Sequence, residues 1–212
     1  MDQTVIFRDF EERDIDFVYR CKNDEKLNSL IVGDYHPFTY EEATRWVHGC
    51  MGEHNAYKFW AICTNDDENR IVGWVSLSEI DYVNQSACFH GIMIGDEKYR
   101  DGKAWIESFL FIYDYVFYHL KFNRLYGSCL EEHKASYCMT FAMCETVEGI
   151  ARQAVYKNGK FNNVVYGAIL KDEYFYHLKQ GDFEYKKIIA RLLAAKKQLT
   201  CNMGKSKVNH IE

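Results

Sequence analysis

One stretch decides the fold: Gly91-Ile-Met-Ile-Gly-Asp-Glu-Lys-Tyr-Arg-Asp-Gly-Lys-Ala-Trp-Ile-Glu107. A short apolar strand at residues 92–94 runs into a basic turn that contains glycine, and the turn opens a long apolar helix. Free backbone N–H groups in a turn at a helix N-terminus form a site for anions, most often phosphate. The stretch therefore predicts a strand, a turn and a helix with an anion site at the turn.

The composition is that of an ordinary soluble globular protein. The 212 residues, 48% of them hydrophobic, are enough for one good core and fall short of two typical domains. No apolar run approaches the roughly 18–20 residues of a membrane span, and the start Met-Asp-Gln-Thr has no leader-like region. The eight cysteines form no C-x-x-C pair and have no zinc-ligand spacing, which indicates reduced thiols. We therefore expect a cytoplasmic protein with no metal and no membrane partner.

The charge is unevenly distributed. The net charge of −5 argues against nucleic acid as a general partner. Seven basic residues and no acidic one lie between Lys186 and Lys207, so the rest of the chain is strongly acidic. The basic run is typical of a solvated helix face followed by a tail. An alternative that stays open is that the acidic body attracts cationic amines.

Hydrophobic periodicity predicts one α/β domain over residues 1–176, a C-terminal amphipathic helix within 177–200 and a disordered tail at 201–212. Thr39 and Glu42 form a capping box, and Asn-Gly at 158–159 predicts a hairpin. The crossover after the fourth strand makes it parallel to the fifth. The predicted strands are 4–10, 58–64, 71–77, 86–94, 124–130, 150–156 and 162–170, and the predicted helices are 14–21, 39–51, 102–120, 133–144 and 183–199.

This order resembles the GCN5-related N-acetyltransferase (GNAT) superfamily over roughly Thr4 to Tyr174. The local sequence motifs are most similar to those of the branch of ribosomal-protein, spermidine and amino-sugar N-acetyltransferases. The resemblance implies an α/β fold with a mixed, mostly antiparallel sheet of about seven strands, a splayed central pair, helices on both faces and an extra C-terminal helix. Four pieces carry it: Ile71-Val-Gly-Trp-Val-Ser-Leu, Gly91-Ile-Met-Ile-Gly-Asp, Phe122-Asn-Arg-Leu-Tyr-Gly, and Glu148-Gly149 before Tyr156-Lys-Asn-Gly.

The resemblance implies acetyl-CoA as the co-substrate. Its pantetheine amides would pair, like an added strand, with Ile92, Met93 and Ile94. Its pyrophosphate would be wrapped by the turn, where the family has Arg/Gln-x-x-Gly-x-Gly/Ala. In one register Gly102 and Ala104 match and Tyr99 replaces the leading residue. In the other register, read from Arg100, Lys103 and Trp105 stand at glycine positions, while Asp101 adds a negative charge that Arg100 and Lys103 offset.

The resemblance also implies an acid for the leaving thiolate. The family often has Asn-x-x-Ser with a tyrosine four residues later. Here His133 stands for the asparagine, Ser136 matches, and Thr140 takes the place of the tyrosine. Tyr137, on the same predicted helix, is a candidate substitute, and an ordinary packed tyrosine is the alternative. His133 and Ser136 are expected at the cofactor.

A base is needed because an attacking ammonium must lose a proton. Related sequences often have a glutamate just before the strand glycine, and here that position is Phe89. The candidates are His90, which strand alternation turns to the face opposite Phe89, and Glu79 at the end of the third strand. A buried structural histidine and a surface glutamate are the alternatives.

We therefore expect an acetyl-CoA-dependent N-acetyltransferase that moves an acetyl group to a primary amine by direct attack in a ternary complex. The acceptor, a small amine, an amino sugar or a peptide N-terminus, should lie between residues 28–36 and the loop Ser78 to Gln85. The alternative is a catalytically degenerate relative that binds acyl-CoA or serves as an interaction module. The C-terminal helix would be its contact surface or the interface of a homodimer.

Overall fold

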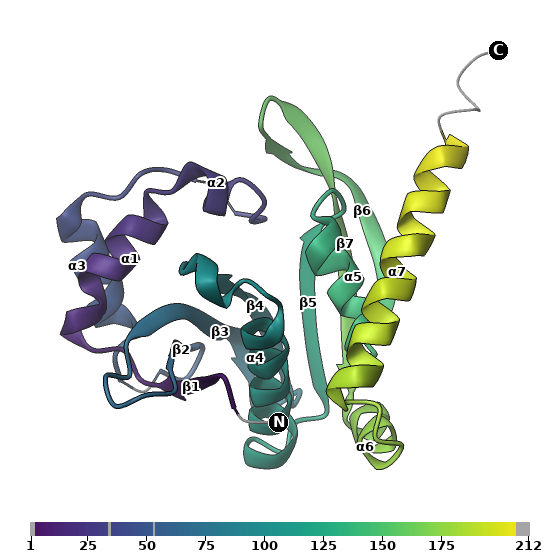
Figure 1. Cartoon of the computed structure of the whole chain (residues 1–212), viewed down its shortest axis with the longest axis horizontal. Helices are drawn as coiled ribbons and strands as arrows, with labels where there is room; N and C mark the ends of the chain where they lie inside the picture. Colours follow the sequence, from purple (N-terminus) through teal and green to yellow (C-terminus); the bar gives the residue numbers. More distant parts are fainter. Residues whose placement is uncertain (1–2, 34, 53, 207–212) are drawn as a thin grey trace. The chain divides into compact units, whose positions relative to one another are not determined.

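A computed structural model describes residues 3–33, 35–52 and 54–206, and the chain divides into two compact units, residues 1–127 and 128–212. Figure 1 labels the helices and strands of both units. The boundary between the units falls inside strand β5, so this strand contributes its first half to one unit and its second half to the other. We describe each unit by itself.

The first unit is built on a sheet of five strands in the order β1-β2-β3-β4-β5. Neighbouring strands are antiparallel except β4 and β5, which are parallel, as the predicted crossover requires. The three central strands follow one another at hairpin spacing, which confirms the predicted meander. The strands are β1 (Val5–Arg8), β2 (Lys58–Thr64), β3 (Ile71–Asp81), β4 (Ser86–Ile94) and β5 (Arg124–Leu130).

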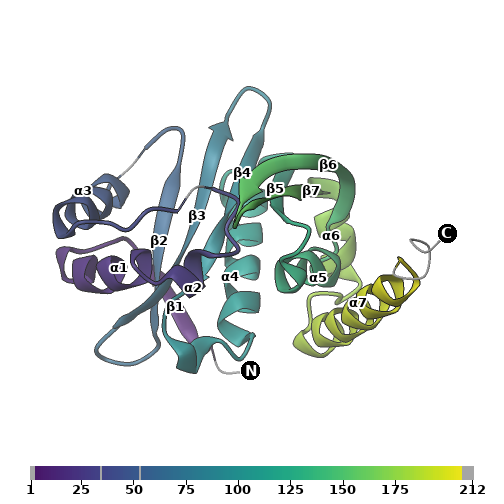
Figure 2. The same ribbon diagram turned by 90° about the horizontal axis from the view of Figure 1, so that it is seen from above.

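Helices cover both faces of this sheet, because its strands alternate apolar side chains between two cores. Ala61 and Cys63 of β2 pack with the helices α1 and α3, whereas Trp60 packs edge-to-face on Phe111 of α4 at 5.2 Å between ring centroids. Figure 2 shows α1 and α3 side by side. The helical elements are η1 (Glu12–Asp14), α1 (Ile15–Lys22), α2 (Glu25–Asn28), α3 (Tyr40–Cys50), η2 (Glu97–Tyr99), α4 (Lys103–Asp114) and the π-helical turn η3 (Tyr115–His119).

Local signals set the start of α3 as the sequence predicts. Thr39 Oγ1 accepts a hydrogen bond from Glu42 N at 3.2 Å, and Glu42 Oε2 accepts one from Thr39 N at 2.7 Å. This reciprocal pair is the predicted capping box, and it satisfies two N–H groups that a helix start leaves unpaired.

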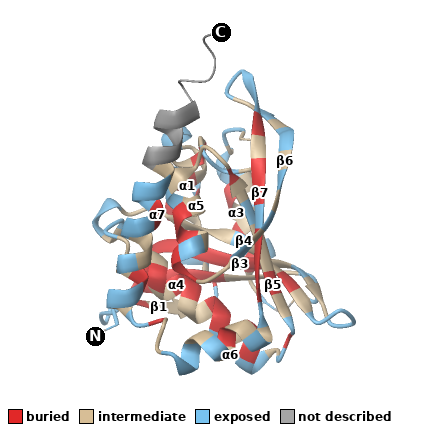
Figure 3. Ribbon diagram, turned by 90° about the vertical axis from the view of Figure 1, so that its right-hand side faces the viewer, coloured by how far each residue is buried: buried red, intermediate tan, exposed pale blue. Residues whose placement is uncertain are grey.

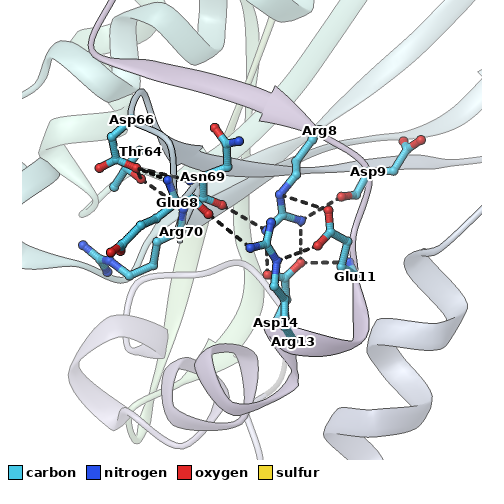
Figure 4. A network of polar contacts seen from close by, with 10 residues as sticks. All are labelled: Arg8, Asp9, Glu11, Arg13, Asp14, Thr64, Asp66, Glu68, Asn69 and Arg70. Carbon is cyan, nitrogen blue, oxygen red and sulfur yellow. Dashed lines mark hydrogen bonds and ion pairs between the residues drawn. The ribbon is translucent and has the colours of Figure 1, made fainter.

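A buried ion pair joins the first strand to the first helical turn (Figure 4). The Arg8 guanidinium donates to both carboxylate oxygens of Asp14, each at 2.8 Å, and Asp14 also accepts from Glu11 N at 2.9 Å. Arg8 reaches Asn69 O at 3.3 Å in the β2–β3 turn as well. The pair therefore links β1, η1 and that turn on the side of the unit where α1 begins.

The second unit consists of the end of β5, a long hairpin and three helices. Strand order is β5-β7-β6, and the hairpin turn at Asn158 and Gly159 has positive φ angles of 53° and 76°, as the predicted Asn-Gly turn requires. β7 is largely buried and β6 largely exposed (Figure 3). The elements are α5 (Lys134–Ala142), β6 (Thr146–Lys157), β7 (Lys160–Leu170), α6 (Lys171–Lys179) and α7 (Tyr185–Ser206).

Several predicted element limits differ from the structure; β3, for example, ends at Asp81 instead of residue 77. The hairpin strands start earlier and run closer to the turn than predicted, and α6 was not predicted at all. Helix α7 continues to Ser206, so residues 201–206 are helical and the prediction of a tail there is wrong. No proline interrupts the helix in this segment, and adding a residue to an existing helix costs little. Residues 207–212 lie outside the described residues, and the domain limits at 176 and 200 stay a prediction.

Candidate functional site

Strands β4 and β5 pair over only part of their lengths. Their parallel register runs from Ser86 opposite Arg124 to Phe89 opposite Gly127. Beyond this point, residues 91–94 of β4 pair with β3, and the register gives them no second partner within the described part of the chain. One edge of β4 is therefore not paired with another strand over residues 91–94, which is the splayed arrangement that the family resemblance implies, although the Ile94 carbonyl on β4 accepts a hydrogen bond from Arg100.

A β-bulge lies where the two strands part. Ser76 opposes Gly91 while Leu77 opposes Phe89, so His90 is the extra residue on β4. Gly91 has a φ of 131°, a value that side-chain-bearing residues rarely adopt. The bulge follows the predicted alternation: the Phe89 ring packs on Phe109 of α4, whereas His90 is exposed beside Ser78. His90 therefore sits at the fork on the face opposite Phe89.

A second irregularity presents Glu79. The β3–β4 register shifts between Ser78 and Asp81, and Glu79 has a φ of 49°, in the left-handed region. Non-glycine residues in this region are uncommon and gather at functional sites. The Glu79 carboxylate reaches across β4 to β5, where it accepts a hydrogen bond from the Tyr126 hydroxyl at 2.8 Å. The sequence did not predict this partner.

Five side chains from three adjacent strands form what we call the polar cluster: Ser78, Glu79, Cys88, His90 and Tyr126. Cys88 stands opposite both Ser78 and Tyr126 in the strand registers. The contact of Ser78 Oγ with His90 Nδ1 is 3.5 Å, too long for a strong hydrogen bond.

Two members of the cluster stay protonated at neutral pH. Burial, followed by the hydrogen bond to Glu79, raises the pKa of Tyr126 well above its ordinary value of 10.0. Burial also raises the pKa of the Cys88 thiol, against a smaller opposite effect of Ser78. The cluster therefore combines proton donors with a carboxylate and an imidazole, which is the chemistry that proton transfer needs.

The basic turn leads into the N-terminus of α4 through Gly102. This residue caps the helix with a φ of 98°, and a Cβ added there would meet nothing within 4 Å. The space over the helix start is therefore open. One helix N–H is occupied, because the exposed Asp101 carboxylate accepts from Lys103 N at 2.9 Å. Ala104 is buried beneath the first turn.

Arg100 folds back onto the strand instead of extending from the turn. Its guanidinium donates to Ile94 O at 3.0 Å and to Gly95 O at 2.7 Å, and it lies 3.5 Å from Glu97. Tyr99 closes the short helix η2 and is half-buried. Arg100 thus fixes the path of the turn against the end of β4.

Glycine at the end of β4 lets helix α1 come close. A Cβ on Gly95 would lie 2.3 Å from Cys21 Sγ and 2.6 Å from Phe17 Cζ, far inside ordinary contact distance. A Cβ on Gly73 of β3 would lie 2.2 Å from Met93 O. Both glycines therefore allow contacts that hold α1 and β3 tightly against the strand that carries the open edge.

The predicted acid and two cofactor residues lie in the second unit. His133 caps α5, and its Nδ1 lies 2.8 Å from Ser136 Oγ. Burial lowers the pKa of His133 below its ordinary 6.5, so the imidazole is neutral at pH 7. The half-buried Tyr137 ring packs on Phe141, and burial, with smaller effects of nearby acidic groups, raises its pKa. Their local arrangement matches the predicted helix start.

In the loop predicted to line the acceptor groove, some polar groups form hydrogen bonds within the loop itself. Asp81 accepts from Val83 N at 2.9 Å, from Asn84 N at 2.8 Å and from the Asn84 side chain at 2.6 Å. These bonds lower the pKa of Asp81. The exposed Tyr82 ring packs edge-to-face on Phe122. Asp81 therefore stabilises the β3–β4 turn, and Glu79 is the carboxylate that belongs to the polar cluster.

The described residues contain neither a metal-binding set nor a helix that could span a membrane. No set of three or more histidine, cysteine, aspartate or glutamate side chains there is arranged to hold a metal ion. None of the helices in that part of the chain is long and apolar enough to span a bilayer.

Comparison with known proteins identifies the family. The family model described as "Acetyltransferase (GNAT) domain" matches residues 4–140. The chain belongs to the GNAT acetyltransferase family. This match covers the open edge of β4, the polar cluster, the turn and Tyr137, so the resemblance drawn from the sequence is confirmed. No curated protein sequence matches the chain.

Several solved structures of acetyltransferases have the same fold as this GNAT chain. Spermidine N-acetyltransferase from Vibrio cholerae, in complex with CoA and spermine, has a TM-score of 0.72 at 20% identity, over 82% of this chain and 99% of that one. A GNAT-family acetyltransferase from Bacillus anthracis gives 0.68 at 22% identity, over 80% and 96%. A GCN5-related N-acetyltransferase from Brucella melitensis gives 0.70 at 18%, over 88% and 85%. The predicted fold class is confirmed.

Proposed function

We propose that the protein is an acetyl-CoA-dependent N-acetyltransferase acting on a primary amine, by direct attack in a ternary complex. One observation carries the proposal: β4 leaves β5 after Phe89, and the open edge of residues 91–94 runs from the polar cluster to the turn before α4. An open strand edge can pair with the amides of an extended ligand, and a helix start favours a phosphate. The family match supports the same activity.

The residues present fit acetyl-CoA, which would supply the acetyl group as a thioester. We propose that the backbone of Ile92, Met93 and Ile94 holds the pantetheine amides. The backbone N–H groups from Gly102 to Ala104 would face the pyrophosphate, with Arg100 and Lys103 adding positive charge. Tyr99 shapes the turn. Asp101 must release Lys103 N before a phosphate takes its place.

The polar cluster would handle the protons. We propose that His90 or Glu79 takes a proton from the acceptor ammonium, directly or through water, and so frees the nitrogen lone pair for attack. Tyr137 is the predicted acid for the thiolate, and His133 and Ser136 are its predicted neighbours at the cofactor. Tyr126 is a second candidate acid, because it lies in the cluster and keeps its proton at neutral pH.

We propose a primary amine as the acceptor, and three classes fit: a small amine, an amino sugar or a peptide N-terminus. A similar structure was solved with spermine, which supports testing polyamines first. The exposed Glu79 carboxylate gives this chain one group that attracts a cationic acceptor. Homodimerisation through α7 and a cytoplasmic location stay predictions from the sequence.

A second candidate function is binding of acyl-CoA without turnover. One feature favours it: Thr140 stands at the position where the family often has the tyrosine acid. In this case the protein would serve as a sensor or an interaction module, with α7 as its contact surface.

Isothermal titration with acetyl-CoA, desulfo-CoA and ATP tests the proposed site. Binding of the two CoA compounds and not of ATP supports it, and an amine screen that starts with spermidine and glucosamine then tests turnover. Binding without turnover of any amine would favour the second candidate. Absence of binding would refute both.

Two substitutions at the turn sharpen the test. Gly102→Glu places a carboxylate where the pyrophosphate should lie and should abolish CoA binding. Gly49→Glu adds the same charge on α3, where a Cβ also meets nothing within 4 Å, and should leave affinity unchanged. Asp101→Asn removes the competing charge and should tighten binding by about tenfold, equivalent to about 1.4 kcal/mol. Circular dichroism checks that each variant is folded. Unchanged affinity in Gly102→Glu would refute the turn assignment.

A further inference from the structure

The Glu79 side chain lies on the opposite face of β3 from the one that regular alternation predicts. Leu77, two residues earlier, pairs with Phe89, whose ring packs on α4. In a regular strand Glu79 would share that face. Tyr126 pairs with Cys88, the residue before Phe89, so the tyrosine side chain lies on the other face. The 2.8 Å hydrogen bond from the Tyr126 hydroxyl therefore places the Glu79 carboxylate on the face of the polar cluster.

A β-bulge with left-handed backbone produces this reversal. In the bulge β3 has two residues, Glu79 and Ile80, where β4 has only Ala87. Ile80 N donates to Ala56 O at 3.1 Å, and Glu79 has a φ of 49°. This conformation is costly for a residue with a side chain, and it persists where the surroundings hold it. Within the described part of the chain, the bond from Tyr126 is the one side-chain hydrogen bond of Glu79.

The Tyr126 side chain is itself held in place. Its strand pairs with β4 at this position, and the Arg124 guanidinium lies over its ring, 5.3 Å from the ring centroid. The hydroxyl donates to Glu79 Oε2. The second carboxylate oxygen, Oε1, has no hydrogen bond or ion pair to any of the described residues. Because Glu79 is exposed, an acceptor amine can reach this second oxygen.

His90, the other candidate base, lacks such a fixed position. Its imidazole is exposed, and its polar contact with Ser78 Oγ is 3.5 Å long, which is too long for a strong hydrogen bond. A base acts efficiently when a third group orients it toward the proton that it takes. Glu79 has such a group in the Tyr126 hydroxyl, and this difference separates the two candidates.

We propose that Glu79 is the base of the acetyl transfer and that Tyr126 is its positioning residue. The inference rests on the proposed function. The acceptor ammonium gives one proton to Glu79 Oε1, which passes it to water. The freed lone pair attacks the thioester carbonyl, the C–N bond forms and the C–S bond breaks. The nitrogen then loses a second proton, which the thiolate takes up, so the products are an amide and CoA.

A double-mutant cycle tests whether Tyr126 acts through Glu79. Tyr126→Phe removes only the hydroxyl and keeps the ring beneath Arg124. We expect it to lower kcat about tenfold, because the carboxylate is no longer held in place. Glu79→Gln should lower kcat about a hundredfold, since it removes the base. In the Glu79→Gln background, Tyr126→Phe should cost nothing further, because residues that act as a unit are not additive.

The assay measures kcat and KM with whichever of spermidine, glucosamine or a peptide with a free N-terminus the wild-type protein acetylates fastest. The affinity for acetyl-CoA, measured by titration, should stay unchanged in all three variants, which separates positioning from a general loss of structure. Tyr40→Phe is the matched control. The Tyr40 hydroxyl donates to Asp16 at 2.9 Å in the same unit, between α3 and α1, and its loss should leave kcat unchanged.

The outcomes separate this inference from the proposed function. An unchanged kcat in Tyr126→Phe would overturn the positioning role. Losses that multiply in the double variant would also overturn it, and would make Tyr126 an independent acid. A smaller loss in Glu79→Gln than in His90→Gln would overturn the assignment of the base. Each of these results leaves the N-acetyltransferase proposal standing. Absence of turnover of every amine by the wild-type protein would refute the proposed function, and this inference with it.

Discussion

The contact between Gly95 and helix α1 makes a quantitative prediction for Gly95→Ala. The new Cβ would lie 2.3 Å from Cys21 Sγ and 2.6 Å from Phe17 Cζ, although ordinary contact begins at 3.4 Å. Both neighbours are buried, at 4% and 8% exposure, so neither swings away freely. Displacements of about 1 Å are needed, and overpacking of this kind costs about 1–3 kcal/mol.

One opposing effect reduces the cost. Alanine restricts the unfolded chain, which stabilises a protein by about 0.4–1 kcal/mol where the backbone allows it, and the φ of Gly95 lies outside the left-handed range. We therefore expect a net loss of about 1–2 kcal/mol. At a urea m-value of about 2 kcal/mol/M the midpoint should fall by about 0.5–1 M.

Tryptophan fluorescence during urea unfolding is the assay. The four tryptophans, at positions 46, 60, 74 and 105, all belong to the first unit, so their signal reports on the unit that contains Gly95. Gly49→Ala is the matched control, because it lies in α3 with nothing within 4 Å and should gain about 0.5–1 kcal/mol.

A double-mutant cycle identifies the contact itself. Cys21→Ala removes the nearest atom, so Gly95→Ala should cost less in that background, by about 1 kcal/mol. A Gly95→Ala protein as stable as the wild type, or strictly additive costs in the double variant, would refute the tight contact between α1 and the end of β4.

Three further predictions concern other parts of the chain. Asp14→Ala leaves the Arg8 guanidinium, 16% exposed, without its main partner and should cost the first unit about 2–3 kcal/mol in urea unfolding, with the exposed Asp67→Ala as control. Burial depresses the pKa of His133 in the folded state, so below pH 6.5 the unfolded state binds more protons than the folded state. The free energy of unfolding should therefore decline as the pH falls below 6.5. His133→Asn should remove this part of the pH dependence, measured by unfolding followed by circular dichroism. If α7 forms a dimer through its exposed Leu193, Leu193→Glu should halve the mass measured by light scattering, and an unchanged mass would exclude that interface.

The sequence predicted most of the fold because its local signals agree with the tertiary structure. The capping box at Thr39 and the Asn-Gly turn at 158–159 each satisfy backbone groups locally, so they need no information from distant residues. Helix α6 was missed because its apolar residues do not form one clean stripe; Tyr174 is buried while Tyr176 is exposed.

The candidate site was predicted less completely, because its geometry depends on irregular backbone. The bulge at His90 and the positive φ of Glu79 follow from strand registers, which no local pattern records. In the sequence Tyr126 stands out only as part of a family motif, and its bond to Glu79 joins residues from two strands that are separated by a third.

The Asp101 cap bears on whether the turn can bind a pyrophosphate, which both candidate functions require. A carboxylate that caps one N–H group is typically worth about 1 kcal/mol. Each hydrogen bond from a backbone N–H to a charged phosphate is worth about 1.5–3 kcal/mol, and the Arg100 and Lys103 charges add to the attraction. Asp101 is exposed, so its carboxylate can return to water when it is displaced. The cap therefore weakens a pyrophosphate site without closing it, and the energetic balance favours binding of a pyrophosphate at this turn.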